Sequence, residues 1–212
     1  MSERAEINIY NADSLAAMKK MPDNAYSLCI ADPPYGIGVN VSMGRRKGQA
    51  HSGYHKFAGA DSAAPPQEYF DELMRVSVNQ IIWGANHFIS KMPIDSPCWA
   101  MWDKGFSDEV TFAQFELAWT SFKTTCKKFD KSPIDRARIH PTQKPVALYK
   151  WLLANYAKPG DKIVDTHGGS CSLAIACWDM GFDLDAWELD ADYYAAAVAR
   201  LEKHKRQGQF DL

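Results

Sequence analysis

The 212-residue sequence predicts an α/β fold, with a seven-stranded, largely parallel sheet that is covered by helices on both faces. Three observations carry this prediction. Short β-prone runs alternate with stretches of helical character along the chain. Hydrophobic residues make up 46% of the sequence and charged residues 24%, which is ordinary for one globular domain over residues 1–212. Polar and glycine-rich motifs follow several of the β-prone runs, where open α/β sheets bind ligands.

The individual elements follow from these patterns in chain order. The expected strands are residues 7–10, 27–31, 80–83, 98–102, 115–119, 162–165 and 183–188. The expected helices are residues 14–20, 66–76, 145–157, 172–180 and 191–204. Because helices alternate with the strands, we expect the strands to run mainly parallel.

Two segments have no sustained periodicity. Residues 36–66 are rich in Gly, Ser, Ala and His and predict a long mobile loop. Residues 123–140 form a shorter, irregular and basic segment. Because both follow strands, both are expected at the ligand-binding edge of the sheet. A run of basic residues is most often solvated surface, so these runs indicate a polyanion only if they flank a site that needs one.

Charge and cysteine content exclude several classes of protein. The formal net charge of −2 gives no hint of a nucleic-acid partner. The five cysteines include no Cys-x-x-Cys pair, and the chain does not start with a basic segment followed by an apolar run. No stretch approaches the roughly 18 apolar residues of a membrane span. These features predict a cytoplasmic protein without a metal site, a structural disulfide or a membrane segment.

The sharpest chemical motif is Asp32-Pro33-Pro34-Tyr35, which follows the strand expected at residues 27–31. The prolines fix their own φ angles and favour extended geometry before them, so Asp32 and Tyr35 are held rigidly. A carboxylate and a prolyl carbonyl can accept hydrogen bonds from the amine of a planar base, while an aromatic ring stacks on the base. This arrangement directs the amine lone pair at an electrophilic methyl group. The alternative is a rigid strand exit with a solvated aspartate.

A glycine-rich turn at residues 165–170, with the sequence Asp-Thr-His-Gly-Gly-Ser, leads from a strand into a helix. Glycines allow a cofactor to approach the backbone, and the helix N-terminus favours an anionic carboxylate. Glu188 lies 19 residues after Gly169, close to the spacing at which a carboxylate reaches ribose hydroxyls. The phosphate-binding pattern GxGxxG is absent. A nucleoside ligand without a pyrophosphate therefore fits this turn better than NAD.

Two further motifs are open to more than one interpretation. Residues 140–145 read His-Pro-Thr-Gln-Lys-Pro and precede a helix, so they form either part of a binding site or a proline-punctuated loop in which Pro145 starts the helix. Asp13 either caps the next helix or contacts the adenine of a cofactor.

In this order, the motifs at residues 32–35, 140–145 and 165–170 resemble those of the β-class amino-methyltransferases of DNA, over the range 13–200. The resemblance implies a Rossmann-like methyltransferase fold with a circularly permuted motif order. It implies S-adenosylmethionine as the cofactor and a base flipped out of DNA as the substrate. Aspartate as the first motif residue favours adenine N6, and the absence of a nuclease motif suits a small solitary or phage-type member.

The resemblance also assigns roles to individual residues. The catalytic positions, which hold and stack the base, are Asp32, Pro33, Pro34 and Tyr35. The cofactor-binding positions are Asp13, Asp32, His140, Thr142, Lys144, Asp165, His167, Gly168, Gly169, Ser170 and Glu188. Residues 123–140 correspond to a short target-recognition segment. The basic residues expected at DNA phosphates are Arg45, Arg46, Lys47, Lys127, Lys128, Arg136 and Arg138.

The chain departs from the family at Thr166-His167, where Pro-Phe is usual, and at Cys171, where Gly is usual. We expect His167 to pack on the cofactor in place of the phenyl ring rather than to act as a base. One alternative is a cytosine-N4 methyltransferase of the same fold, in which the first motif residue is more often Ser. Another is a catalytically inactive DNA-binding module. A homodimer would double the surface that reads DNA.

Overall fold

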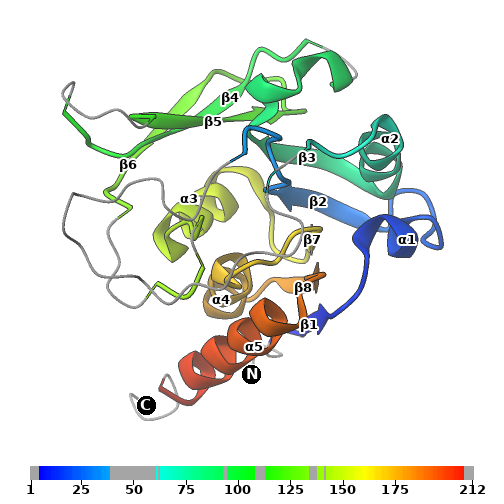
Figure 1. Cartoon of the computed structure of the whole chain (residues 1–212), viewed down its shortest axis with the longest axis vertical. Coiled ribbons are helices and arrows are strands. Elements are labelled where there is room, and N and C mark those ends of the chain that lie inside the picture. The colour runs from blue at the N-terminus through cyan, green and yellow to red at the C-terminus, as the bar shows by residue number, and fades with distance from the viewer. Residues whose placement is uncertain are drawn as a thin grey trace.

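The computed structural model describes residues 5–38, 61, 63–92, 95–107, 113–133, 138–140 and 142–207. Its strands are β1 (Ile7–Tyr10), β2 (Tyr26–Ala31), β3 (Ser77–Trp83), β4 (Trp99–Asp103), β5 (Phe115–Thr120), β6 (Lys127–Asp130), β7 (Lys162–Asp165) and β8 (Asp183–Trp187). They form one sheet in the order β1-β8-β7-β2-β3-β5-β4-β6 (Figure 1). Five of the neighbouring pairs are parallel, and the two pairs that β5 makes are antiparallel. The predicted α/β fold with a mostly parallel sheet is confirmed.

The helices pack on both faces of the sheet, as predicted. They are α1 (Ser14–Met18), α2 (Gln67–Val76), α3 (Val146–Tyr156), α4 (Ser172–Met180) and α5 (Ala191–Gln207), with short 3-10 turns η1 (Ala85–His87) and η2 (Ile89–Lys91). Buried side chains of α1 and α2 join the hydrophobic core on one face, and those of α3, α4 and α5 join the core on the other (Figure 1).

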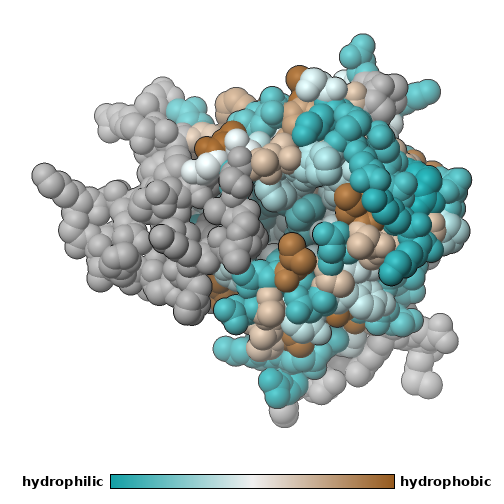
Figure 2. All heavy atoms as spheres, turned by 45° about the vertical axis from the view of Figure 1, so that its right-hand side comes forward, coloured by the Kyte–Doolittle hydropathy of each residue, from teal (hydrophilic) through white to brown (hydrophobic). Residues whose placement is uncertain are grey.

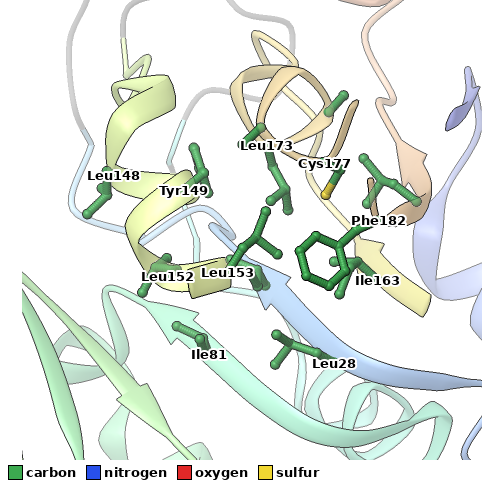
Figure 3. Close-up of a cluster of buried hydrophobic side chains, with 14 of the residues drawn as sticks. Leu28, Ile81, Leu148, Tyr149, Leu152, Leu153, Ile163, Leu173, Cys177 and Phe182 are labelled. Carbon is green, nitrogen blue, oxygen red and sulfur yellow. The ribbon is translucent and has the colours of Figure 1, made fainter. Parts of the chain in front are cut away.

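The packing of α3 determines where the chain before it lies. Pro145, which lacks a backbone N–H, directly precedes the first turn of this helix. Buried side chains of α3, α4 and the central strands then meet in one cluster, and its labelled members in Figure 3 are Leu28, Ile81, Leu148, Tyr149, Leu152, Leu153, Ile163, Leu173, Cys177 and Phe182. Each fully buried leucine or isoleucine side chain contributes about 1.5–3 kcal/mol to the stability of the fold, relative to the same side chain exposed to water. This packing anchors α3, and with it residues 142–145, over the centre of the sheet.

The sheet has one strand more than the seven predicted. The extra strand, β6, lies within residues 123–140, which the sequence had indicated to be irregular. The expected position of this segment was also partly wrong. Because β5 runs antiparallel to β3, the chain leaves β5 at the edge opposite to the ligand-binding edge, and only the end of β6 returns to it.

The described helices and the face of the surface in Figure 2 bear on whether the protein has a membrane segment or a large apolar contact. Among the described residues, no helix combines the length and apolar composition needed to span a bilayer. On the face shown in Figure 2, hydrophobic side chains of the described residues form separate spots between hydrophilic ones. A chemical site is therefore better sought among the polar side chains at the strand ends.

Candidate active site

The switch point of the sheet lies between β2 and β7, which are adjacent and from which the chain turns to opposite faces of the sheet. After β2 the chain enters α2 on one face of the sheet, and after β7 it enters α4 on the other face (Figure 1). Such a switch point leaves a crevice beyond the carboxyl ends of the two strands. Asp32 follows β2 and Asp165 ends β7, so two acidic side chains lie at its opening.

Both carboxylate oxygens of Asp32 accept hydrogen bonds, one from the partly buried Tyr35 and one from the buried Lys144. The Tyr35 hydroxyl donates to Oδ1 at 2.8 Å, and the Lys144 ammonium donates to Oδ2 at 2.5 Å. Burial raises the pKa of Asp32, and the positive charge of Lys144 opposes that rise. Burial also raises the pKa of Tyr35, so its hydroxyl stays protonated and serves as a donor. The arrangement fixes the rotamer of Asp32.

A fourth, partly buried group, Glu116 of β5, joins this cluster. Its Oε2 lies 3.0 Å from the Lys144 ammonium and 3.2 Å from the Tyr35 hydroxyl, while its Oε1 pairs with Lys104 at 2.6 Å. Although burial raises the pKa of Glu116, the two lysines lower it to about 2. Two carboxylates and two ammonium groups therefore lie in one cluster around Asp32.

The ring of Tyr35 is held from the side of β3. Gly84 follows this strand with φ +70°, and a Cβ atom on it would come within 2.1 Å of the Tyr35 ring. The imidazole of His87 stacks on the same ring, with centroids 5.3 Å apart and planes 17° apart. Only glycine fits both the backbone conformation and the space at position 84.

We predict that Gly84→Ala lowers the free energy of unfolding by about 2–5 kcal/mol, since the left-handed backbone and the overlap with the Tyr35 ring both cost energy. Urea denaturation measures the change. Gly181→Ala is the matched control, because Gly181 has φ +78° and nothing lies within 4 Å of its added Cβ. It should lose only about 1–2 kcal/mol. Equal losses in the two variants would show that the contact with Tyr35 is unimportant for stability.

The glycine-rich turn lies against the end of β8. Gly168 N–H donates to the Trp187 carbonyl at 2.7 Å, and Gly169 N–H donates to Glu188 Oε2 at 2.8 Å. A Cβ on Gly168 would come within 3.3 Å of the Trp187 carbonyl, which is tighter than ordinary contact. The glycines thus bring the turn and the Glu188 carboxylate together.

Electrostatics make this part of the crevice suitable for a cation. Asp165 is 5% exposed, and burial together with the nearby Asp32 and Glu188 carboxylates raises its pKa to about 7, although a hydrogen bond from His167 N–H opposes the rise. Burial also raises the pKa of Glu188. Buried carboxylates are stabilised by a cationic partner, so a ligand that carries positive charge fits them. No cluster of three His, Cys, Asp or Glu side chains suited to a metal occurs in the described part of the chain.

A sequence model of the family described as DNA methylase, of the N6/N4 type, matches residues 80–199, more than half of the chain. The chain belongs to the N6/N4 DNA methylase family. The match contains the glycine-rich turn and begins after Asp32.

Two relatives and two solved structures extend this result. The protein named "Putative methylase YubD" of Escherichia coli (strain K12) is 22% identical over 93% of this chain and 91% of its own length. The DNA adenine methyltransferase YhdJ of the same strain is 30% identical over 32% of this chain and 24% of its own length. The complex of M1.HpyAVI with SAM has a TM-score of 0.62 at 18% identity and covers 92% of this chain and 98% of that one. The PvuII DNA methyltransferase, specific for cytosine N4, also has a TM-score of 0.62, at 14% identity, and covers 96% of this chain and 91% of that one. These likenesses support the methylase fold.

The structure separates the residues of the His-Pro-Thr-Gln-Lys-Pro motif of the methylase. Lys144 reaches into the Asp32 cluster, whereas His140 packs edge-on against Tyr193 of α5 at 4.3 Å. Burial lowers the pKa of His140 to about 4, and its Nδ1 lies 3.3 Å from Thr142 N and 3.1 Å from Thr142 Oγ1. His140 is therefore neutral, and it orders the turn before α3.

Asp13 interacts electrostatically with His167, which belongs to the glycine-rich turn. Asp13 caps α1 by accepting a hydrogen bond from Ala16 N–H at 2.8 Å, which confirms the capping interpretation. Burial lowers the pKa of His167 to about 4, and the Asp13 carboxylate opposes this shift. The His167 ring lies edge-on to Tyr69 of α2, with centroids 5.4 Å apart. Its expected role, packing on the cofactor rather than acting as a base, remains a prediction.

Three of the basic residues predicted to contact DNA are described, and each has a hydrogen-bond or ion-pair partner within the protein. Lys127 donates to Asn155 of α3 at 2.7 Å, and Lys128 pairs with Asp103 and Asp130. Arg138 donates to the Gln143 carbonyl at 3.1 Å. Four other residues predicted to contact DNA lie outside the described part of the chain: Arg45, Arg46, Lys47 and Arg136. Most of the loop at 36–66 lies outside it as well.

The sequence analysis did not assign three residues of the site: Lys104, Glu116 and His87. A signal existed for Glu116, because it is a single acid inside the otherwise apolar strand Phe-Glu-Leu-Ala-Trp-Thr. An acid at such a position needs a buried partner. The sequence does not show which partner.

Proposed function

We propose that this methylase transfers the methyl group of S-adenosylmethionine to the N6 amine of an adenine that is flipped out of DNA, in the cytoplasm. The observation that carries the proposal is that the hydrogen-bonded Asp32 carboxylate lies near two other acids, Asp165 and Glu188. This carboxylate lies at the end of β2, is oriented by Tyr35 and Lys144, and neighbours the acids at the ends of β7 and β8.

The residues of the chain divide the work as follows. Asp32 and the Pro33 carbonyl accept hydrogen bonds from the exocyclic amine, and Tyr35, backed by His87, offers a stacking surface to the base. Held in this way, the amine nitrogen presents its lone pair to the crevice. The bound cofactor supplies an electrophilic methyl group. As the carbon–nitrogen bond formed, the carbon–sulfur bond of the cofactor would break, and Asp32 would receive the proton that the nitrogen loses.

The crevice fits S-adenosylmethionine by charge and by shape. The cofactor carries a sulfonium and an ammonium, and the buried Asp165 offers a carboxylate that a cation stabilises. Gly168, Gly169 and Ser170 let the backbone approach the ligand, and Glu188 is expected at the ribose hydroxyls. Asp13, His140, Thr142 and His167 remain predicted contacts of this cofactor.

Cytosine N4 is the competing target, since the solved PvuII enzyme with this fold is specific for it. Aspartate at position 32 and the similarity to the adenine methyltransferase YhdJ favour adenine. DNA contacts by the predicted basic residues, and a homodimer, remain predictions from the sequence.

The decisive experiment incubates the protein and S-adenosylmethionine with genomic DNA that lacks methylated bases, followed by nucleoside mass spectrometry. We predict N6-methyladenine, confined to a short or relaxed recognition sequence. N4-methylcytosine alone would instead support the competing target. If purified, cofactor-binding protein modified neither base, the chain would be an inactive DNA-binding module.

A further inference from the structure

Glu116 reaches the catalytic motif because β5 runs against the direction of β2 and β3. Its partner across the sheet is Trp102 of β4, and the next residue, Leu117, accepts a hydrogen bond from Gly84 N–H at 2.9 Å. The antiparallel strand therefore starts at the edge where β2 ends. This direction brings a carboxylate 81 residues away in sequence to within 3.2 Å of the Tyr35 hydroxyl.

Glu116 and Lys104 add one negative and one positive charge to the pair of Asp32 and Lys144, so the enlarged cluster stays neutral. The side chain of Lys144 is 2% exposed, and its ammonium contacts both Asp32 and Glu116. Lys104 neutralises the remaining oxygen of Glu116. A buried charge is tolerated when counter-ions and hydrogen bonds satisfy it, and removing one partner leaves the other uncompensated. Together with Tyr35 these groups form one network of five side chains, in which Lys144 and Tyr35 are each shared between two carboxylates.

We propose that Glu116 is a positioning residue for methyl transfer, which holds the Lys144 ammonium and the Tyr35 hydroxyl against Asp32 and so fixes the direction in which Asp32 meets the substrate amine. This inference rests on the proposed function, because it requires that the reaction takes place at Asp32. It does not depend on whether the base is adenine or cytosine.

The same geometry gives Glu116 an electrostatic effect. The negative charge of Glu116 raises the pKa of Asp32, whereas the positive charge of Lys144 lowers it. Burial is the largest cause of the overall rise. The other titratable groups that interact with Asp32 are Tyr35, Tyr69, Tyr149 and Asp165. If the charge of Glu116 is removed, the Lys144 ammonium pairs with Asp32 only, so the pKa of Asp32 should fall. Removing the charge of Lys144 should raise it.

The test measures single-turnover transfer of a labelled methyl group into DNA, counted over all bases, as a function of pH. We expect Glu116→Gln to lower the rate roughly 10- to 100-fold with S-adenosylmethionine affinity within about threefold, since positioning acts on the reaction step. The acidic limb of its pH profile should move to lower pH, and that of Lys144→Met to higher pH. Glu116→Asp keeps the negative charge, so the acidic limb of its pH profile should lie at the same pH as in the unaltered protein.

Glu72→Gln is the matched control, because Glu72 has the same 20% side-chain exposure as Glu116 and pairs with Arg75 at 2.7 Å, within α2. It should transfer methyl at the unaltered rate. The proposal is overturned if Glu116→Gln does so too, or if it loses cofactor affinity as much as rate while the acidic limb stays in place.

A separate readout tests the inference without turnover. Carboxyl carbon NMR follows the titration of Asp32 in the unaltered protein and in Glu116→Gln. A lower pKa of Asp32 in the variant supports the inference even if DNA is not methylated, which would overturn the proposed function alone. An unchanged titration would contradict the inference.

Discussion

Replacement of Asp32 by alanine is expected to reduce the single-turnover rate of methyl transfer by at least about 10³-fold, while S-adenosylmethionine binding stays within about tenfold. The reason is that the acceptor for the substrate amine disappears, whereas the acids near the glycine-rich turn remain. Rapid-quench transfer of labelled methyl to DNA measures the rate, and titration calorimetry measures cofactor affinity.

The fold should survive this substitution, because Lys144 keeps Glu116 as a counter-ion at 3.0 Å. Thermal unfolding of the variant serves as the control for folding. A rate within about tenfold of the unaltered protein would remove Asp32 from the catalytic role, since a lost catalytic hydrogen bond alone costs more than that.

Asp165→Asn should weaken S-adenosylmethionine binding by roughly 10- to 100-fold, because it removes a charged partner of the cationic cofactor. The pKa of Asp165 is raised to about 7, so the unaltered protein should gain about tenfold in affinity from pH 6 to pH 8 as the carboxyl ionises. The variant should lose this gain. Calorimetric titrations at the two pH values measure both effects.

The same substitution should stabilise the free protein at pH 8, by on the order of 2 kcal/mol. Because burial holds the pKa of Asp165 above its unfolded value, stability is lost as the pH rises from that value through about 7. Asp185→Asn is the matched control, since Asp185 is 6% exposed but pairs with Lys162 at 2.7 Å, and its pKa is lowered. Neutralising Asp185 should destabilise the protein at pH 8. Changes of the same sign in both variants would contradict the cost that we assign to the Asp165 charge.

Local patterns sufficed for most of the fold. The five predicted helices and the seven predicted strands all occur in the described residues, close to where the sequence patterns placed them. The eighth strand, β6, has the sequence Lys-Lys-Phe-Asp, which lacks the apolar alternation of a half-buried strand. It forms because the edge of β4 offers unpaired backbone groups, and that is a property of the assembled sheet.

The site was predictable to the extent that its residues lie in contiguous motifs. Asp32 and Asp165 follow adjacent parallel strands, so the motifs on those strands had to meet. Glu116 was missed because its position depends on the antiparallel direction of β5, which its own residues do not encode. Lys144 was predicted at the cofactor, but it contacts an aspartate 112 residues earlier in the chain, and only the packing of α3 determines that contact.

The composition of β6 also bears on the behaviour of the protein at high concentration. This strand is the last in the sheet, and an exposed sheet edge can recruit a strand from another molecule and start aggregation. Along it the charged Lys128 and Asp130 are exposed and pair with each other at 2.7 Å. A second strand could dock there only by removing these charges from water, which is unfavourable. Lys128, which the sequence predicts at DNA, and Asp130 thus protect this edge of the described sheet from pairing with another strand.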